Sequence, residues 1–192
     1  MPDRNQPALD FLLSRRSRPA KTLTGPAPDR DALTEILTAA ARTPDHGKLE
    51  PWRFIVLERG ALDRLADLAK ARGEALGHEA RDVEKAVSQF ADSPLAVVVV
   101  ESPVISDKIP VIEQTYSAGA VALSLLNAAL AAGWGANWLT GWVASDPVFT
   151  TEGLGLSPHE RVVGTIHIGT ETAAPPDRPR PDLERIVTWR SA

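Results

Sequence analysis

The segment Arg15-Arg16-Ser17 combines side chains that proteins use to hold a phosphate group. A guanidinium group forms bidentate, charge-assisted hydrogen bonds to phosphate oxygens, and a serine hydroxyl adds another donor. The same arginines follow a short predicted helix, where cations also stabilise the carboxyl end of the helix dipole without any ligand. The tripeptide alone therefore allows an anion site but favours the plainer interpretation.

A second candidate is the loop TPDHGKLEP at residues 43–51, which joins a predicted helix to a predicted strand. Asp45, His46 and Lys48 could form a hydrogen-bonding cluster beside Gly47, where a ligand can approach the backbone. A capped turn with a surface histidine is the alternative, and it is favoured by the loop alone.

Two further segments lie in the last third of the chain. In GWGANWLTG, residues 133–141, the glycines let the backbone approach a flat ligand, and Trp138 offers a stacking face. A tight turn into a strand explains this stretch equally well. Near the C-terminus, Arg178 and Arg180 alternate with prolines that hold the chain extended. These arginines could contact a phosphate or remain solvated.

Several other chemistries find no support in the sequence. There is no cysteine, which excludes disulfides, thiolate metal sites and cysteine nucleophiles. The four histidines are scattered without the spacing of metal ligands, so no metal site is predicted. The chain has no GxGxxG fingerprint, Walker loop or GxSxG elbow, and therefore lacks the common nucleotide and hydrolase motifs.

The composition is that of an ordinary globular protein. The 192 residues are 43% hydrophobic and 24% charged, which suggests one domain over residues 1–192 with a sizeable core. A net charge of -4 gives no basic face for nucleic acid. The N-terminus places apolar residues before its arginines, the wrong order for a secretory signal, so a cytoplasmic location is expected.

Residues 118–143 carry no charge, a length that could suggest a membrane span. However, alanine and glycine dominate this segment, and Ser124, Asn127, Asn137 and Thr140 interrupt it. No membrane association is predicted. A helix in a tightly packed core or subunit interface is expected instead.

Hydrophobic periodicity and turn residues predict interleaved helices and strands. Helices are expected at residues 7–14, from the cap Asp29 to Pro44, at 60–77, 79–90 and 113–132, and after Ser145-Asp146-Pro147. Strands are expected at residues 52–57, 95–100, 137–143 and 161–169, followed by an extended tail over about 170–192. The order lacks a strict βαβ rhythm, which favours an α+β fold.

Taken together and in this order, the motifs RRS, PDHGKLEPW, AAGWGANWLTGW, VVGTIHIG and the basic C-terminus resemble the nitroreductase family. The similarity covers residues 9–189, and the short bacterial NAD(P)H nitroreductases are the most similar members. It implies a central, mostly antiparallel sheet wrapped by helices, in an intertwined homodimer with FMN at two interface sites. The C-terminal tail would cross to the partner subunit.

The resemblance also assigns roles to residues of this chain. FMN would be held by Arg15, Arg16, Ser17, Arg42, His46, Trp138, Leu139, Thr140, Arg178 and Arg180. The NAD(P)H side would be bordered by Ala128, Ala129, Leu130, Ala131, Ala132 and Gly133. Two positions depart from the family pattern: Glu50 replaces a glutamine, and Leu139 stands where short relatives often have arginine.

The implied reaction passes hydride from NADH or NADPH through the flavin to a nitroaromatic or quinone in a ping-pong cycle. The chemistry would occur at flavin N5 and require no catalytic side chain. Lys21 and Lys48 are candidates for stabilising negative charge on the flavin. A dehalogenase-like reaction on the same fold, or a flavin-binding sensor with little turnover, are the alternatives.

Overall fold

The protein is described by a computed structural model over residues 3–191. Five strands form one sheet in the order β1-β5-β3-β2, with β4 also paired to β5, and every pairing is antiparallel. The strands are β1 (Leu23–Thr24), β2 (Trp52–Leu57), β3 (Leu95–Glu101), β4 (Gly135–Leu139) and β5 (Arg161–Glu171). The α+β prediction with a mostly antiparallel sheet is confirmed.

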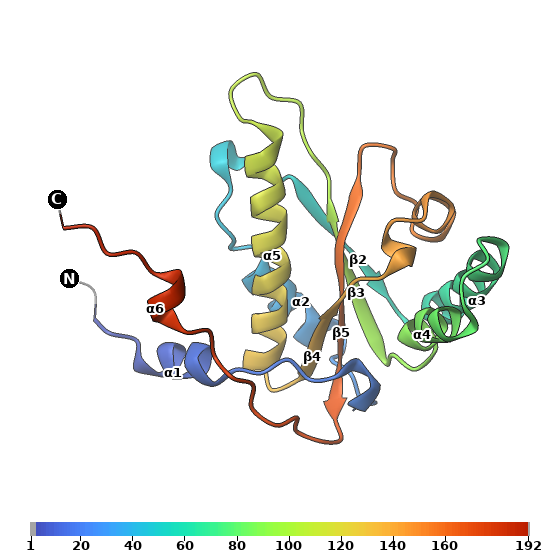
Figure 1. Ribbon diagram of the computed structural model, residues 1–192, viewed down its shortest axis with the longest axis horizontal. Coiled ribbons are helices and arrows are strands. Elements are labelled where there is room, and N and C mark those ends of the chain that lie inside the picture. Colours follow the sequence, from blue (N-terminus) through green and yellow to red (C-terminus); the bar gives the residue numbers. More distant parts are fainter. Residues whose placement is uncertain (1–2, 192) are drawn as a thin grey trace.

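Helices cover both faces of this sheet (Figure 1). On one face lie α2 (Arg30–Ala40) and the long α5 (Val111–Ala131), and on the other lie α3 (Arg59–Ala75) and α4 (Ala80–Ala91). The alternation of side chains along β3 separates two cores: Leu95, Val97 and Val99 pack on the first side, and Ala96, Val98 and Val100 on the second. All of β3 is buried, as its continuous apolar run predicts.

The N-terminal and C-terminal segments leave the body of the protein on the same side (Figure 1). The N-terminal segment forms α1 (Gln6–Ser14), and the C-terminal tail forms the short α6 (Leu183–Ile186). The two segments meet where the Nε of Arg16 donates to the carbonyl oxygen of Pro176, 3.4 Å away. Apart from one half-buried proline, the tail residues between 172 and 191 are exposed.

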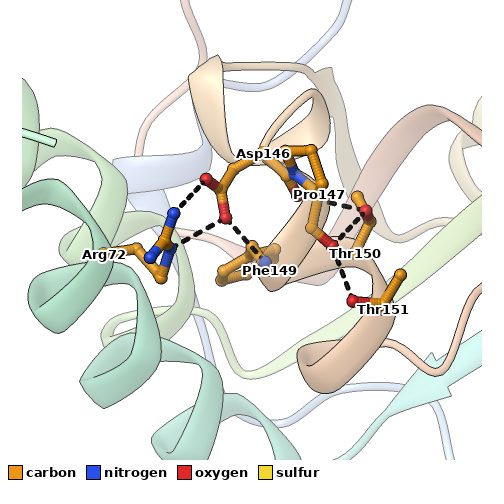
Figure 2. A network of polar contacts seen from close by, with 6 residues as sticks. All are labelled: Arg72, Asp146, Pro147, Phe149, Thr150 and Thr151. Atoms are coloured by element: carbon orange, nitrogen blue, oxygen red, sulfur yellow. Dashed lines mark hydrogen bonds and ion pairs between the residues drawn. The ribbon is translucent and has the colours of Figure 1, made fainter. Parts of the chain in front are cut away.

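Side-chain caps mark the start of several helical segments. The Asp29 carboxylate accepts the backbone N–H of Ala32 at 2.9 Å, which confirms the predicted cap of α2. Asp146 acts similarly: its Oδ1 lies 2.7 Å from the backbone nitrogen of Phe149, and Pro147 occupies the first helical position. Figure 2 shows that this carboxylate is also held by Arg72 of α3, through two hydrogen bonds of 3.0 and 2.9 Å.

Two sequence expectations are corrected. The strand expected at 137–143 lies at Gly135–Leu139 instead. The chain leaves the sheet after Leu139, and Trp142–Ala144 form a 3-10 turn. The tail is not wholly extended: β5 continues to Glu171, and Asp182 caps the helical turn α6 by accepting the N–H of Glu184. The last tail residue, Ala192, lies outside the described residues.

Within residues 3–191, none of the helices combines the length and the apolar character that crossing a bilayer would require. The helix α5, which carries no charge from residue 118 onward, instead buries Val121, Ala122, Leu125 and Ala129 completely against the sheet and α2. Its small side chains therefore serve close packing.

Candidate functional site

Arg15, Arg16, Ser17 and Arg180 come together where the N-terminal loop meets the tail. The Nη2 of Arg15 donates to the Oγ of Ser17 at 2.9 Å, whereas its Nε is buried and has no hydrogen-bond partner among the described residues. Burial lowers the pKa of Arg15, and the positive charges of Arg16 and Arg180 lower it further. Guanidinium groups crowded in this way favour an anionic ligand.

The other charges nearby do not neutralise this cluster. Within residues 3–191, neither Arg15 nor Arg16 forms an ion pair with a carboxylate. Arg180 pairs with Asp177 at 3.1 Å, but both side chains are exposed, and such pairs contribute little. Arg178 is exposed, and no side-chain contact places it in the cluster. Guanidinium groups without carboxylates are suited to phosphate.

The loop that carries the cluster is anchored to β4. The backbone N–H of Arg18 donates to the carbonyl oxygen of Ala136 at 2.8 Å, and the Nδ2 of Asn137 donates to the carbonyl oxygen of Arg18 at 2.6 Å. The Arg18 side chain also pairs with Glu171 at 2.7 Å. The arginine cluster is thus held at a fixed position relative to the predicted ligand-lining residues of β4.

Those β4 residues do not share one surface. Trp138 packs half-buried on the α5 side of the sheet, and a Cβ at Gly164 would collide with its indole ring. Leu139 and Thr140 instead line a cleft of about 310 Å³ against Lys21, Lys85 and Gln89. Successive side chains of a strand point to opposite faces, which separates Leu139 from Trp138, whereas Thr140 follows the end of β4.

The floor of the cleft reaches a buried histidine. Ser93 lines the cleft, and its Oγ lies 2.9 Å from the Nδ1 of His167. His167 is completely buried, its Nε2 has no partner in the described structure, and burial lowers its pKa to about 4. The imidazole is therefore neutral at physiological pH. The sequence offered no signal for this contact, because Ser93 and His167 are distant along the chain.

The second predicted lining segment, residues 43–51, has an unusual backbone. Gly47, Lys48 and Glu50 adopt positive φ angles of 75°, 56° and 49°. For Lys48 and Glu50, which have a Cβ, this conformation is strained and costs free energy of folding. Such strain is typical of functional loops. The Oδ2 of Asp45 offsets part of it by accepting the N–H of Glu50 at 2.6 Å.

His46 extends from this loop to the other end of α5. Its Nδ1 lies 2.6 Å from the Oε2 of Glu113, beside an open hollow of about 510 Å³ over the first turns of the helix. The arginine cluster lies near the opposite end, and positions 113 and 131 are roughly 27 Å apart along an α-helix. One chain therefore does not bring His46 to Arg15, whereas Arg42 lies nearer the middle of the helix, since the neighbouring Thr43 hydrogen-bonds to Ser124.

The segment predicted to border NAD(P)H closes α5. Ala129 is completely buried, Ala128 and Leu130 are partly buried, and Ala131, Ala132 and Gly133 are exposed. Gly133 has a φ of 87°, and the N–H of Trp134 donates to the carbonyl oxygen of Ala129 at 3.1 Å. Helices often end at a glycine in this conformation, so the helix end alone explains the glycine at position 133.

No metal centre is built by the described part of the chain, where no three histidine or carboxylate side chains gather. The candidate site has two parts near β4. One is the cluster of Arg15, Arg16 and Arg180, and the other is the cleft beside Leu139.

Comparison with known proteins identifies the family of the chain. The family model matches residues 12–170, and the chain belongs to this family. "Putative NAD(P)H nitroreductase YdjA" of Escherichia coli K12 is 34% identical over 163 residues, which cover 85% of this chain and 87% of that protein. A "Putative NAD(P)H nitroreductase" of Haemophilus influenzae is 38% identical over 166 residues, covering 85% and 88% respectively.

Solved structures show the same fold. A nitroreductase-like family protein from Bacillus cereus superposes with a TM-score of 0.75 at 25% identity, over the full length of both chains. A nitroreductase of Desulfovibrio desulfuricans, solved in complex with FMN, has a TM-score of 0.74 at 21% identity and covers 97% of this chain and 98% of that one. The predicted family and fold are confirmed.

Proposed function

We propose that the protein is an FMN-dependent oxidoreductase that takes electrons from NADH or NADPH and reduces nitroaromatic or quinone-type acceptors. The observation that carries the proposal is the buried Nε of Arg15, which has no partner within a cluster of three guanidinium groups. The names of the relatives and the FMN complex of a structural neighbour support the same assignment.

The cluster fits the phosphate end of FMN. Arg15 and Arg16 supply charged donors, Ser17 supplies a hydroxyl, and Arg180 brings a further positive charge from the tail. A dianionic phosphate would satisfy the free Nε and offset the mutual repulsion of the arginines. The ring would then extend along β4 toward Leu139 and Thr140, whose cleft offers space for an acceptor.

FMN, when bound, accepts hydride from NAD(P)H and delivers two electrons to the acceptor. In the overall reaction, a nitro compound, NAD(P)H and a proton give a nitroso compound, NAD(P)+ and water. A quinone would give the corresponding quinol. A ping-pong order follows if the nicotinamide ring of NAD(P)H and the acceptor occupy the same cleft in turn. The chain itself then binds, orients and shields the reactants, so no catalytic side chain is required.

The active protein would be a homodimer. One face of α5 carries the exposed side chains of Ile112, Tyr116 and Leu123 and the half-buried side chain of Asn127. The Oδ1 of Asn127 is buried and has no hydrogen-bond partner in the described chain. These residues lie on one side of the helix, since their spacing follows its period. Burying such a face against a second copy would stabilise the association through removal of apolar surface from water.

The second copy would also complete the site. Because His46 lies far along α5 from Arg15, it would reach a flavin bound at that cluster only from the partner subunit, and Arg42 of the same segment would come from that subunit too. The C-terminal tail would cross to the partner subunit in the same dimer. It carries Leu183, Ile186 and Trp189, and Trp189 is 91% exposed. An aromatic side chain left in water this way is typical of a segment that packs against another chain.

The first experiment is a visible absorption spectrum of the freshly purified protein, repeated after anaerobic addition of NADH and then NADPH. The expected result is a flavin band that bleaches. Protein that stays colourless after incubation with FMN would contradict the proposal, and bound flavin that neither nucleotide reduces would favour a sensor over an enzyme.

Dimer formation is tested separately by Leu123→Glu, which places a charge on the exposed face of α5. We expect a monomer by light scattering and loss of FMN. Leu76→Glu, at an equally exposed leucine after α3, is the matched control, since the two side chains are 46% and 50% exposed. A dimer that persists in Leu123→Glu would remove this face from the interface.

A further inference from the structure

The cleft beside β4 carries two lysines that the binding of FMN phosphate does not use. Lys21 enters it from the 3-10 turn at Ala20–Thr22, and Lys85 enters from α4. Both side chains are exposed, and neither forms an ion pair with any residue between 3 and 191. Two cations from separate elements therefore converge on one small space.

One carboxylate faces the same space. Asp92, directly after α4, lines the cleft and has no ion-pair partner in the described structure. Two lysines and one aspartate leave a formal charge of +1. An anionic ligand is favoured over a cationic one, although solvent screens these exposed charges.

The remaining lining sets the size and shape of the ligand. Leu139 and Ala20 are apolar, and the aliphatic stems of the lysines add further apolar surface. Ser88 and Gln89 supply neutral hydrogen-bonding groups. The volume of about 310 Å³ lies at the lower end of small-molecule sites. It fits one aromatic ring with a substituent and is too small for a dinucleotide.

We propose that this cleft binds single-ring aromatic acceptors that carry a carboxylate, with Lys21 and Lys85 as the residues that select the charge. The ring would lie against Leu139, and the carboxylate would meet the lysine ammonium groups. That such a ligand becomes reduced rests on the proposed function. The charge selection itself requires only the cleft.

The test compares a charged ligand with its neutral isostere. Calorimetric titration of the purified dimer with benzoate and benzamide, neither of which is reduced, measures binding alone. We expect benzoate to bind more tightly than benzamide. Lys21→Gln and Lys85→Gln should each weaken benzoate binding about two- to fivefold, which corresponds to the loss of one exposed ion pair. Benzamide binding should not change. Asp92→Asn should strengthen benzoate binding, and Lys85→Arg should retain it.

The same variants are then assayed with 4-nitrobenzoate and 4-nitrobenzamide. The KM for 4-nitrobenzoate alone should rise in the two glutamine variants, with Lys70→Gln on the exposed face of α3 as the control. Equal binding of benzoate and benzamide would overturn the proposal. A changed KM for NADPH with unchanged benzoate binding would also overturn it, because the lysines would then recognise the nucleotide. Lysine-dependent benzoate binding by a protein that holds no flavin would refute the proposed function and leave this inference standing.

Discussion

The imidazole of His167 and the hydroxyl of Ser93 form a buried pair in which the histidine is the donor. The Ser93 Oγ donates its proton to the carbonyl oxygen of Leu95 at 3.0 Å, so it accepts from the Nδ1–H of His167 at 2.9 Å. The Nε2 of His167 then carries an unpaired lone pair in the interior. The imidazolium would keep the Nδ1–H bond, so it is burial of the ring that lowers the pKa of His167 and keeps it neutral.

The buried histidine predicts acid sensitivity of the fold. Its folded pKa is about 4, against an ordinary value of 6.5, so the unfolded chain binds a proton first as the pH falls. This contribution to stability is present above pH 6.5 and is lost between pH 6.5 and 4. At pH 5 the loss is about 2 kcal/mol, at 1.36 kcal/mol per pKa unit.

The measurement is urea unfolding at pH 7 and pH 5. The difference between the two free energies of unfolding should be smaller by this amount in His167→Gln than in the unsubstituted protein. An equal difference in both proteins would show that His167 does not titrate in this range. His159→Gln, at an exposed histidine, is the control.

Asp146 has two roles that substitutions can separate. Its hydrogen bonds from Arg72 lower the pKa of the carboxyl below its usual value, and its Oδ1 caps the following helical turn. Asp146→Asn keeps a capping oxygen but loses the charge, whereas Asp146→Ala loses both. We expect the alanine variant to be the less stable one, with the cap alone contributing about 1 kcal/mol.

This stability is measured by thermal unfolding at pH 7, with Asp67→Ala on the exposed side of α3 as control. Since the folded pKa of Asp146 is depressed, its contribution is present above the ordinary pKa of 3.8 and declines as the pH falls below it. Identical melting temperatures for Asp146→Asn and Asp146→Ala would show that the cap contributes nothing.

Arg15→Gln tests the phosphate site. Loss of one charge-assisted contact should weaken FMN binding by about 1.5–3 kcal/mol, or more than tenfold in Kd. The protein itself should become no less stable without FMN, because the substitution relieves repulsion from Arg16 and Arg180. Fluorescence titration of the apoprotein with FMN gives the Kd, and Arg81→Gln on α4 is the control. Unchanged affinity would remove Arg15 from the site.

Gly164→Ala should disturb the packing of Trp138. The added Cβ would collide with the indole ring of Trp138. Because the Cβ is fixed to the strand backbone, the indole ring would have to move. We expect a loss of about 1–3 kcal/mol, as for other overpacked cores, together with a change in tryptophan fluorescence. At Gly60 in α3, an added Cβ meets no atom within 4 Å, so Gly60→Ala should be neutral or stabilising. Equal stability of the two variants would contradict this account.

Much of the secondary structure could be read from the sequence because its signals are local. The strand Trp52–Leu57 lies where the apolar run predicts it, and Asp29 and Asp146 cap the helices that follow them. A cap or an apolar run acts within a few residues, so the helix start or strand that it predicts depends little on the surrounding packing. The family followed from the order of several such motifs, none of which was decisive alone.

The composition of the site depended on contacts between distant parts of the chain. Only the fold brings the positive charge of Arg180 to Arg15, puts Lys85 across a cleft from Lys21, and buries His167 on Ser93. Likewise, only the length and packing of α5 separate His46 from the arginine cluster, which is why the proposed FMN site takes His46 from a second subunit. The sequence by itself thus determined the elements and the family, since those depend on neighbouring residues. The tertiary structure decided which charged groups meet, since that depends on how the elements pack.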